Sequence, residues 1–168
     1  MNFFQVIEAR QSIRAFTDTP VDPEKIQVIL DAAVNRSPSA GNLQAYQVYV
    51  VTDATARRDL SRVAINHSGR PQLFLAEAPV VLVFCVDAER SGQRYGQKGR
   101  ELFAVQDTTI ACTYADLAAA ALGLGSCFVG SFDPDGVRRA IGAPEGVTPI
   151  TLLPIGYPAS RPPRRARR

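Results

Sequence analysis

The chain contains a single histidine, His67, and only three cysteines, none of them in Cys-x-x-Cys spacing. A structural zinc site takes four Cys or His ligands, and a histidine-based triad sets its histidine beside a nucleophile and an acid. The sequence cannot readily supply either set, so we predict no metal site. Cys85, Cys112 and Cys127 each lie in an apolar segment, and we expect them to be reduced core residues. His67 lies in a polar stretch and is expected in a loop.

Long apolar runs are also absent. No segment approaches the length of a membrane span, and the opening residues 1–10 contain Glu8 and lack a signal-peptide cleavage pattern. We therefore expect a soluble, cytoplasmic protein. A chain of 168 residues is typical of one domain, and its 46% apolar residues are enough to build a core.

Positive charge is concentrated at one end of the chain. The formal net charge is +3, but five arginines lie in residues 161–168, and without them the remainder carries −2. We therefore divide the chain into a domain, residues 1–160, and an arginine-rich tail, residues 161–168. Such a tail can bind nucleic acid nonspecifically, close over a phosphate, or remain a solvated end. Nucleic acid is the least favoured, because aromatic residues and a recognition motif are missing from the tail.

The segment from Asp107 to Leu122 contains no Gly or Pro, and Ala and Leu dominate its second half. Strong helix formers with apolar residues around most of the circumference predict a central helix that is buried on all sides. Gly123 and Gly125 are expected to end it, before a short strand at residues 126–129 and Gly130. The glycines either cap the helix or let a flat ligand approach the main chain closely.

The remaining patterns predict a mixed sheet covered by helices. Helices are expected at residues 2–10, 22–35, 54–65 and 72–78 and after Asp133, and strands at residues 48–51, 79–86 and 147–155. In the first helix Phe3, Val6 and Ile7 are expected to point inward. Residues 91–99 are polar and glycine-rich and are interpreted as a mobile loop. Prolines in the last strand favour an edge or end position.

Two guanidinium groups and a hydroxyl alternate in the segment from Arg10 to Arg14. If the segment is extended, Arg10, Ser12 and Arg14 point to one side while Ile13 anchors the other. Three convergent donors, two of them charged, suit a phosphate better than a carboxylate of the same domain. The other interpretation is a pair of ordinary surface arginines.

A loop of small polar residues, Ser37 to Asn42, follows the second predicted helix. Such residues can bring backbone N–H groups and the Asn42 side chain against a planar heterocycle.

Five separated motifs together resemble the nitroreductase family, in that family's order and over the whole chain. They are residues 10–14, 38–44, 106–107, 123–130 and 154–158. The resemblance implies a mainly antiparallel α+β fold with a central buried helix, in an intertwined homodimer that binds FMN at its interface. It also implies a set of FMN-binding residues from both subunits. The element that holds the phosphate and ribityl chain is matched by Arg10, Ser12 and Arg14. The loop that reaches the isoalloxazine from the other subunit is matched by Pro38, Ser39, Ala40 and Asn42. The backbone by flavin N5 and O4 is matched by Val129 and Gly130, and the candidates to reach back to the phosphate are Arg164 and Arg165.

The resemblance further implies a hydride transfer from NADH or NADPH through flavin N5 to a small organic acceptor, such as a nitroaromatic compound or a quinone, in ping-pong order. No side chain is then needed as a catalytic residue, because the flavin carries the chemistry. Backbone N–H groups near N5 and O4 would favour the negative charge of reduced flavin. The alternatives are a flavin-binding or storage protein without efficient turnover, and a domain that binds polyanions through the tail.

Some residues depart from the family pattern. Gln11 replaces an arginine that is common in the first motif, and Phe128 replaces a frequent tryptophan. The chain also lacks the apolar C-terminal extension of many members and the longer insertion that shapes the substrate channel. Residues 91–99 are candidates to take the place of that insertion.

Overall fold

A four-stranded antiparallel sheet in the order β1-β2-β4-β3 is the framework of the computed structural model, which describes residues 1–163. The strands are β1 (Tyr46–Val51), β2 (Val80–Val86), β3 (Gly125–Ser126) and β4 (Thr148–Gly156). The helices are α1 (Phe3–Ala9), α2 (Pro23–Val34), α3 (Ala54–Val63), α4 (Phe74–Glu77), α5 (Ala88–Lys98), α6 (Ala104–Ala121) and α7 (Pro134–Ala140), with a 3-10 turn η1 (Ala40–Asn42) and a π-helical turn η2 (Gly99–Phe103). The α+β class and the mainly antiparallel sheet are confirmed, because every pair of named strands is antiparallel.

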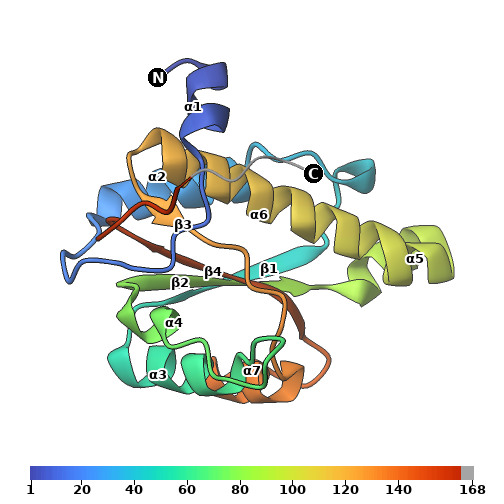
Figure 1. Cartoon of the computed structure of the whole chain (residues 1–168). Helices are drawn as coiled ribbons and strands as arrows, with labels where there is room; N and C mark the ends of the chain where they lie inside the picture. The colour runs from blue at the N-terminus through green and yellow to red at the C-terminus, as the bar shows by residue number, and fades with distance from the viewer. Residues whose placement is uncertain (164–168) are drawn as a thin grey trace.

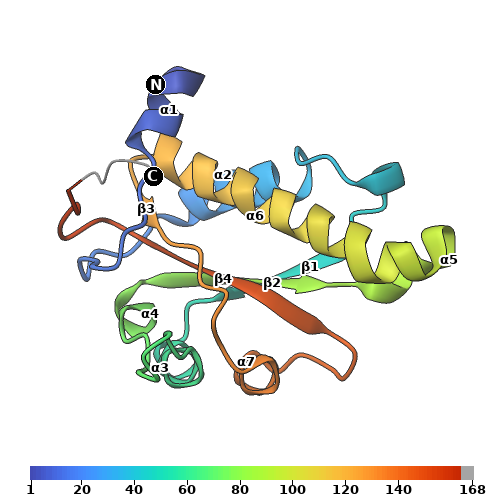
Figure 2. The ribbon, with the colours of Figure 1, turned by 45° about the vertical axis from the view of Figure 1, so that its right-hand side comes forward.

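Helices cover both faces of the sheet (Figure 1). The helices α2 and α6 lie on one face and α3, α4 and α7 on the other, whereas α1 stands away from the sheet, as the second view also shows (Figure 2). Every residue of β2 is buried, as its continuous apolar run predicts. Leu82 belongs to the core cluster that contains Ala115 of α6, and its neighbour Val83 belongs to the cluster that contains Leu60 of α3. Alternate side chains of one strand thus fill two cores.

The central helix α6 lies on the sheet with one side only. Ala111, Ala115 and Ala119 are fully buried there, but Val105 and Tyr114 on the other side are each 38% exposed. The prediction that this helix is buried on all sides is therefore wrong for the single chain. Composition could not show the difference, because short alanine and threonine side chains occupy both sides of the helix.

The end of α6 is a glycine cap. Gly123 has a φ of +78°, which a residue with a Cβ rarely adopts. The N–H of Leu124 donates to the Ala119 carbonyl at 2.9 Å, and the N–H of Gly123 donates to the Ala120 carbonyl at 3.1 Å. These bonds satisfy carbonyls that a helix end leaves unpaired, so Gly123 caps the helix.

Residues 91–98 form most of helix α5 and Gly99 begins η2, so the prediction of a mobile loop is wrong. The Asp87 side chain caps the helix by accepting from the Arg90 N–H at 3.0 Å. Gly92 packs closely under the Arg100 side chain, and Gly99 packs against the Ser91 carbonyl. Glycine weakens a helix locally, but these two glycines let α5 and η2 pack closely together. The sequence of the segment alone does not reveal such a tertiary contact.

Two other predictions are corrected at the ends of the chain. In α1 only Val6 is buried, whereas Phe3 and Ile7, which were expected inward, are exposed. The last strand, β4, lies between β2 and β3 and not at an edge. The N–H of Leu152 points away from β2 and donates to the Val129 carbonyl. Residues two apart in a strand share this direction, so the nitrogen of Pro154 also points away from β2. Pro154 is tolerated because no hydrogen bond to β2 is lost there.

The cysteines and His67 lie where the sequence predicts. All three cysteines are buried and free, and His67 lies in an exposed turn. Within residues 1–163 no helix has both the length and the apolar character that a membrane crossing requires. The same residues contain no group of three or more His, Cys, Asp or Glu side chains that could hold a metal ion.

Candidate functional site

The segment from Arg10 to Arg14 runs beside β3. The Ile13 N–H donates to the Ser126 carbonyl at 2.8 Å, and Ser12 forms a parallel bridge with Ser126. The Ile13 side chain is buried, as predicted, and it explains Gly125: a Cβ at Gly125 would lie 2.7 Å from Cγ1 of Ile13. Close packing thus joins the predicted phosphate element to the turn that follows α6.

A buried carboxylate, Asp116 of α6, faces this element. The Ser126 hydroxyl donates to Oδ1 of Asp116, and Nη1 of Arg10 lies 3.7 Å from Oδ2. Burial raises the pKa of Asp116, while the Ser126 hydrogen bond and the Arg10 charge oppose that rise. Of the three donors that were expected to suit a phosphate better than a carboxylate of the same domain, Arg10 therefore has such a carboxylate beside it. Asp116 could have been noticed in the sequence as an acid within an alanine-rich helix.

Positive charge predominates around Ser12 and Arg14. Burial raises the pKa of the nearby Cys127 thiol, and the Arg14 charge and the Ser12 hydrogen bond oppose that rise. Arg14 is exposed and forms no ion pair with any acid in the described part of the chain. The cluster therefore carries more positive than negative charge, which is the condition for binding an anion.

The start of the tail returns to the same place. The Ala159 N–H donates to the Ala15 carbonyl at 3.0 Å, and Nη1 of Arg161 lies 3.4 Å from the Ala9 carbonyl oxygen. A third guanidinium group therefore lies near the Arg10 to Arg14 segment. Arg164 and Arg165, the predicted phosphate ligands of the tail, lie outside the described residues.

The loop of residues 38–42 is held at the beginning of α6. The Ala40 N–H donates to both carboxylate oxygens of Asp107, at 3.0 and 3.1 Å, and the Ser39 hydroxyl accepts from the Gln44 N–H at 3.0 Å. Burial raises the pKa of Asp107, and the bond from Ala40 opposes that rise. Asn42 has a positive φ of 57°, and its side-chain oxygen accepts from the Gln44 amide at 2.6 Å. The loop is thus fixed in an unusual conformation by side-chain contacts.

Two arginines of α5 hold the same loop, and the sequence analysis missed them. Nη1 of Arg90 donates to the Gln44 carbonyl at 2.7 Å, and Nη1 of Arg94 donates to the Gly41 carbonyl at 3.3 Å. Their spacing of one helical turn places both on one side of α5. Arg94 lies in the segment that was interpreted as a loop, and no motif in the sequence pointed to Arg90.

The two predicted halves of the site do not meet within one chain. The half around Arg10 contacts α6 at Asp116, and the loop at Ala40 contacts it at Asp107. Nine positions along a helix correspond to roughly 14 Å along its axis. The structure therefore brings together Arg10, Ser12 and Arg14, and separately the loop of residues 38–42.

Val129 and Gly130 differ in what their backbones offer. The Val129 N–H donates to the Leu152 carbonyl at 2.9 Å, so it is occupied within the sheet. The Gly130 N–H donates to no backbone carbonyl within residues 1–163. A Cβ at Gly130 would meet nothing within 4 Å, so the space beside it is open.

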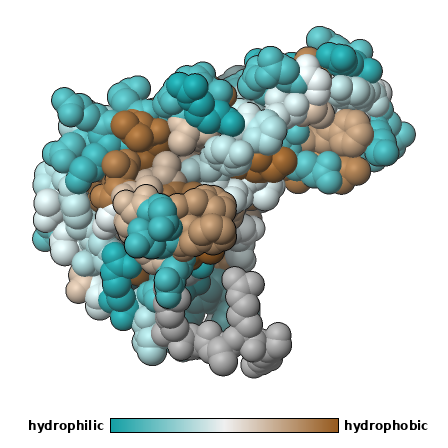
Figure 3. Space-filling model, turned by 90° about the horizontal axis from the view of Figure 1, so that it is seen from above, coloured by the Kyte–Doolittle hydropathy of each residue, from teal (hydrophilic) through white to brown (hydrophobic). Residues whose placement is uncertain are grey.

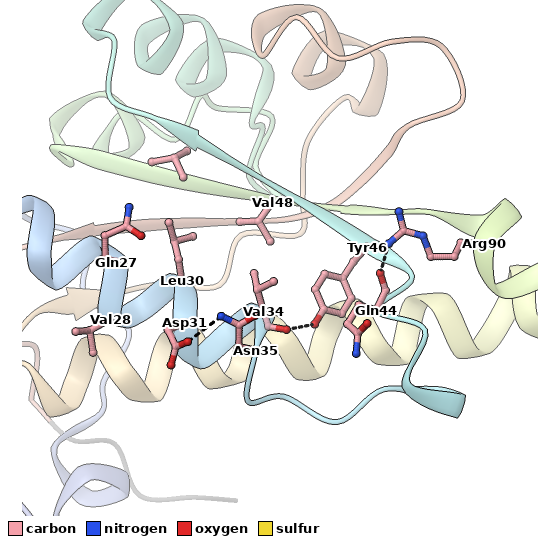
Figure 4. A pocket seen from close by; sticks show the side chains of 11 residues that line it. Gln27, Val28, Leu30, Asp31, Val34, Asn35, Gln44, Tyr46, Val48 and Arg90 are labelled. Atoms are coloured by element: carbon pink, nitrogen blue, oxygen red, sulfur yellow. Dashed lines mark hydrogen bonds between the residues drawn. The ribbon is translucent and has the colours of Figure 1, made fainter.

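A groove of about 800 Å³ lies elsewhere, between α2 and the outer edge of β1 (Figure 4). Tyr46 and Val48 of β1 and Leu30 and Val34 of α2 face it, and Gln44 and Arg90 lie at one end. None of the predicted site residues lines this groove.

Comparison with known proteins agrees with the motifs. The model of the Nitroreductase family matches residues 7–71 and 62–157. An "NADH dehydrogenase" of Thermus thermophilus is 33% identical over 89% of this chain and 83% of its own length. An "FMN reductase (NADPH)" of Bacillus subtilis is 31% identical over 95% of this chain and 67% of its own length.

A crystal structure of a nitroreductase family protein from Clostridium novyi NT superimposes with a TM-score of 0.84. It is 26% identical, and the match covers 94% of this chain and 86% of that one. Sequence and fold thus agree over nearly the whole chain: it belongs to the nitroreductase family of oxidoreductases.

Proposed function

We propose that the protein is an FMN-dependent NAD(P)H oxidoreductase that passes hydride to a small organic acceptor such as a nitroaromatic compound or a quinone. The observation that carries the proposal is the cluster of Arg10, Ser12 and Arg14 beside the turn after α6. The name of the Bacillus subtilis relative, an FMN reductase that uses NADPH, supports the same cofactor and donor.

The donor set fits a flavin phosphate. Arg10, Arg14 and Arg161 provide three guanidinium groups, and Asp116 provides the one carboxylate paired with them. Guanidinium groups bind phosphate oxygens through charge-assisted hydrogen bonds. In this arrangement Asp116 holds Arg10, while Arg14 is free to reach the phosphate. We place Arg164 and Arg165 on the same phosphate.

The backbone at Gly130 is suited to the flavin ring. Its N–H has no carbonyl partner in the described chain, and the space beside its Cα is open. We assign the Gly130 N–H, and not the Val129 N–H, as the donor for flavin N5 or O4. Such a fixed dipole favours negative charge on the ring. Bound FMN supplies the hydride acceptor that no side chain of the protein offers.

A second copy of the chain completes the site in this proposal. Apolar side chains gather in several areas on the side of the molecule where α1 stands (Figure 3). Phe3 and Phe4 of α1, and Val105 and Tyr114 of α6, are exposed. Apolar patches that stay exposed often mark protein–protein interfaces. A homodimer would cover it and bring Pro38, Ser39, Ala40 and Asn42 of one chain to the flavin held by the other.

The test is the visible spectrum of the purified protein, followed by anaerobic addition of NADH and then NADPH. The proposal predicts bound FMN that bleaches at once with at least one donor. Bound flavin that neither donor reduces would favour a storage protein. A colourless protein that cannot be reconstituted with FMN would contradict the proposal at its cofactor. In that case a steeply salt-dependent association with polyanions would identify the tail as the binding element.

A further inference from the structure

The hairpin of α5 and η2 lies at the N-terminal end of α6, beside the loop of residues 38–44 (Figures 1 and 2). Gly96, inside α5, has a φ of +62° and interrupts the helical conformation shortly before η2 begins at Gly99. The rings of Tyr95 and Phe103 then meet edge to face, with centroids 5.2 Å apart. The hairpin touches the loop directly, because Arg94 donates to the Gly41 carbonyl. Under the proposed function it therefore lies next to the flavin that this loop covers.

Four cations lie on this hairpin, and only two of them are neutralised. Arg90 pairs with Asp87 at 3.2 Å, and Arg100 pairs with Glu89 at 2.9 Å. The other two, described next, form no ion pair with any acid of residues 1–163.

These two cations, Arg94 and Lys98, rest on aromatic rings. The Arg94 guanidinium carbon lies 5.5 Å from the centroid of Tyr95, and Nζ of Lys98 lies 5.3 Å from the centroid of Phe103. Cation–π contacts of this length restrain long side chains without neutralising their charge. The nearby acid Glu101 accepts from the Gln97 amide at 2.8 Å and not from Lys98. Two exposed cations are thus held in place and remain available to an anion.

We propose that Arg94 and Lys98 bind a phosphate group of the nicotinamide dinucleotide donor. This inference rests on the proposed function. A dinucleotide is the phosphate-bearing partner of that reaction, whereas nitroaromatic compounds and quinones need carry no negative charge. The phosphate is either the pyrophosphate, which both donors contain, or the 2′-phosphate, which only NADPH contains.

The experiment compares wild type with Lys98→Gln, Arg94→Gln and the double variant, all loaded with FMN. Stopped-flow reduction of the flavin gives a Kd and a limiting rate for NADPH, for NADH and for N-methyl-dihydronicotinamide, which has no phosphate. Calorimetric titration of the oxidised protein with NADP⁺ and NAD⁺ measures binding without turnover. Lys98→Gln is the cleaner variant, because Lys98 makes no hydrogen bond to the loop. Lys98→Arg tests rescue, and Arg58→Gln removes one exposed charge from α3, on the other face of the sheet, as the matched control.

A charge-assisted contact at an exposed position predicts that each single variant raises the donor Kd roughly fivefold to tenfold. In Lys98→Gln the limiting rate and the Kd of N-methyl-dihydronicotinamide should not change. Arg94 also donates to the Gly41 carbonyl of the loop, so Arg94→Gln is judged by the Kd of the dinucleotides relative to that of N-methyl-dihydronicotinamide. A rise for NADPH alone identifies the 2′-phosphate, and a rise for both dinucleotides identifies the pyrophosphate.

Two results would overturn the inference while leaving the proposed function intact. One is an unchanged Kd for both dinucleotides. The other is an equal rise for the donor without phosphate, which would show that the two residues only support the loop. If the wild type binds no FMN, the proposed function itself fails, and this inference fails with it.

Discussion

Replacement of Arg14 by alanine separates phosphate recognition from folding. Arg14 is exposed and pairs with no acid in residues 1–163, so its removal leaves no carboxylate uncompensated. A hydrogen bond to a charged group contributes about 1.5–3 kcal/mol, so FMN affinity should fall roughly 10- to 150-fold. Riboflavin has the same ring and ribityl chain without the phosphate, and its affinity should not change.

Arg10→Ala provides the contrast. Nη1 of Arg10 lies 3.7 Å from the buried Asp116, so its removal leaves that carboxylate without its cation. We expect weaker FMN binding together with a loss of about 1 kcal/mol in the free energy of unfolding. This is less than for a fully buried pair, because Arg10 is 35% exposed.

Both variants are measured by titration of flavin into apoprotein, with urea unfolding alongside and Arg58→Ala as the control. Unchanged FMN affinity in Arg14→Ala would remove Arg14 from the site. An equal loss for FMN and riboflavin would show that Arg14 acts on the fold and not on the phosphate.

Three further predictions concern the backbone, the tail and the buried acids. Gly130→Val should lower flavin content. Far-UV circular dichroism should stay the same, because the new side chain meets open space within its own chain. Normal flavin content and turnover would exclude Gly130 from the site. Deletion of residues 161–168 should increase FMN loss during gel filtration, and intact retention would make the tail a solvated end. Burial raises the pKa of Asp107 and of Asp116 in the folded protein above the value near 3.8 of the unfolded chain. Their contribution to the free energy of unfolding is therefore fully present below about pH 3.8 and is lost as the pH rises through the folded pKa values. Between about pH 4 and 8 the free energy of unfolding, measured with urea, should therefore decline less steeply when both are changed to asparagine. Identical slopes in the variant and in wild type would contradict the assigned shifts.

Local patterns predicted those elements whose sequence and burial agree. The run in β2 is apolar throughout and is buried throughout. Pro23 lies at the first turn of α2, and Gly123 caps α6 at the predicted place. The alternation around Ile13 also placed its side chain correctly in the core.

The features that sequence did not reveal depend on contacts between distant residues. Gly92 and Gly99 weaken α5 locally but permit its close packing against η2. Arg10 and Asp116 are 106 positions apart, so no local pattern could pair them. The exposed side of α6 has the composition of a buried side, which is expected if a second chain covers it.

Complementation between two defective chains tests whether two chains share each flavin site. Arg14→Glu should repel the phosphate. Gly41→Val should distort the loop, since Gly41 has a φ of +58° and a Cβ there would lie 2.5 Å from the Tyr95 hydroxyl. Each variant alone should bind little FMN. A heterodimer purified through two different tags has one site with both defects and one site with none, so it should recover about half of the wild-type flavin and NAD(P)H-dependent turnover. A heterodimer that recovers neither would show that each site belongs to a single chain and would contradict the proposed flavin site shared between two chains.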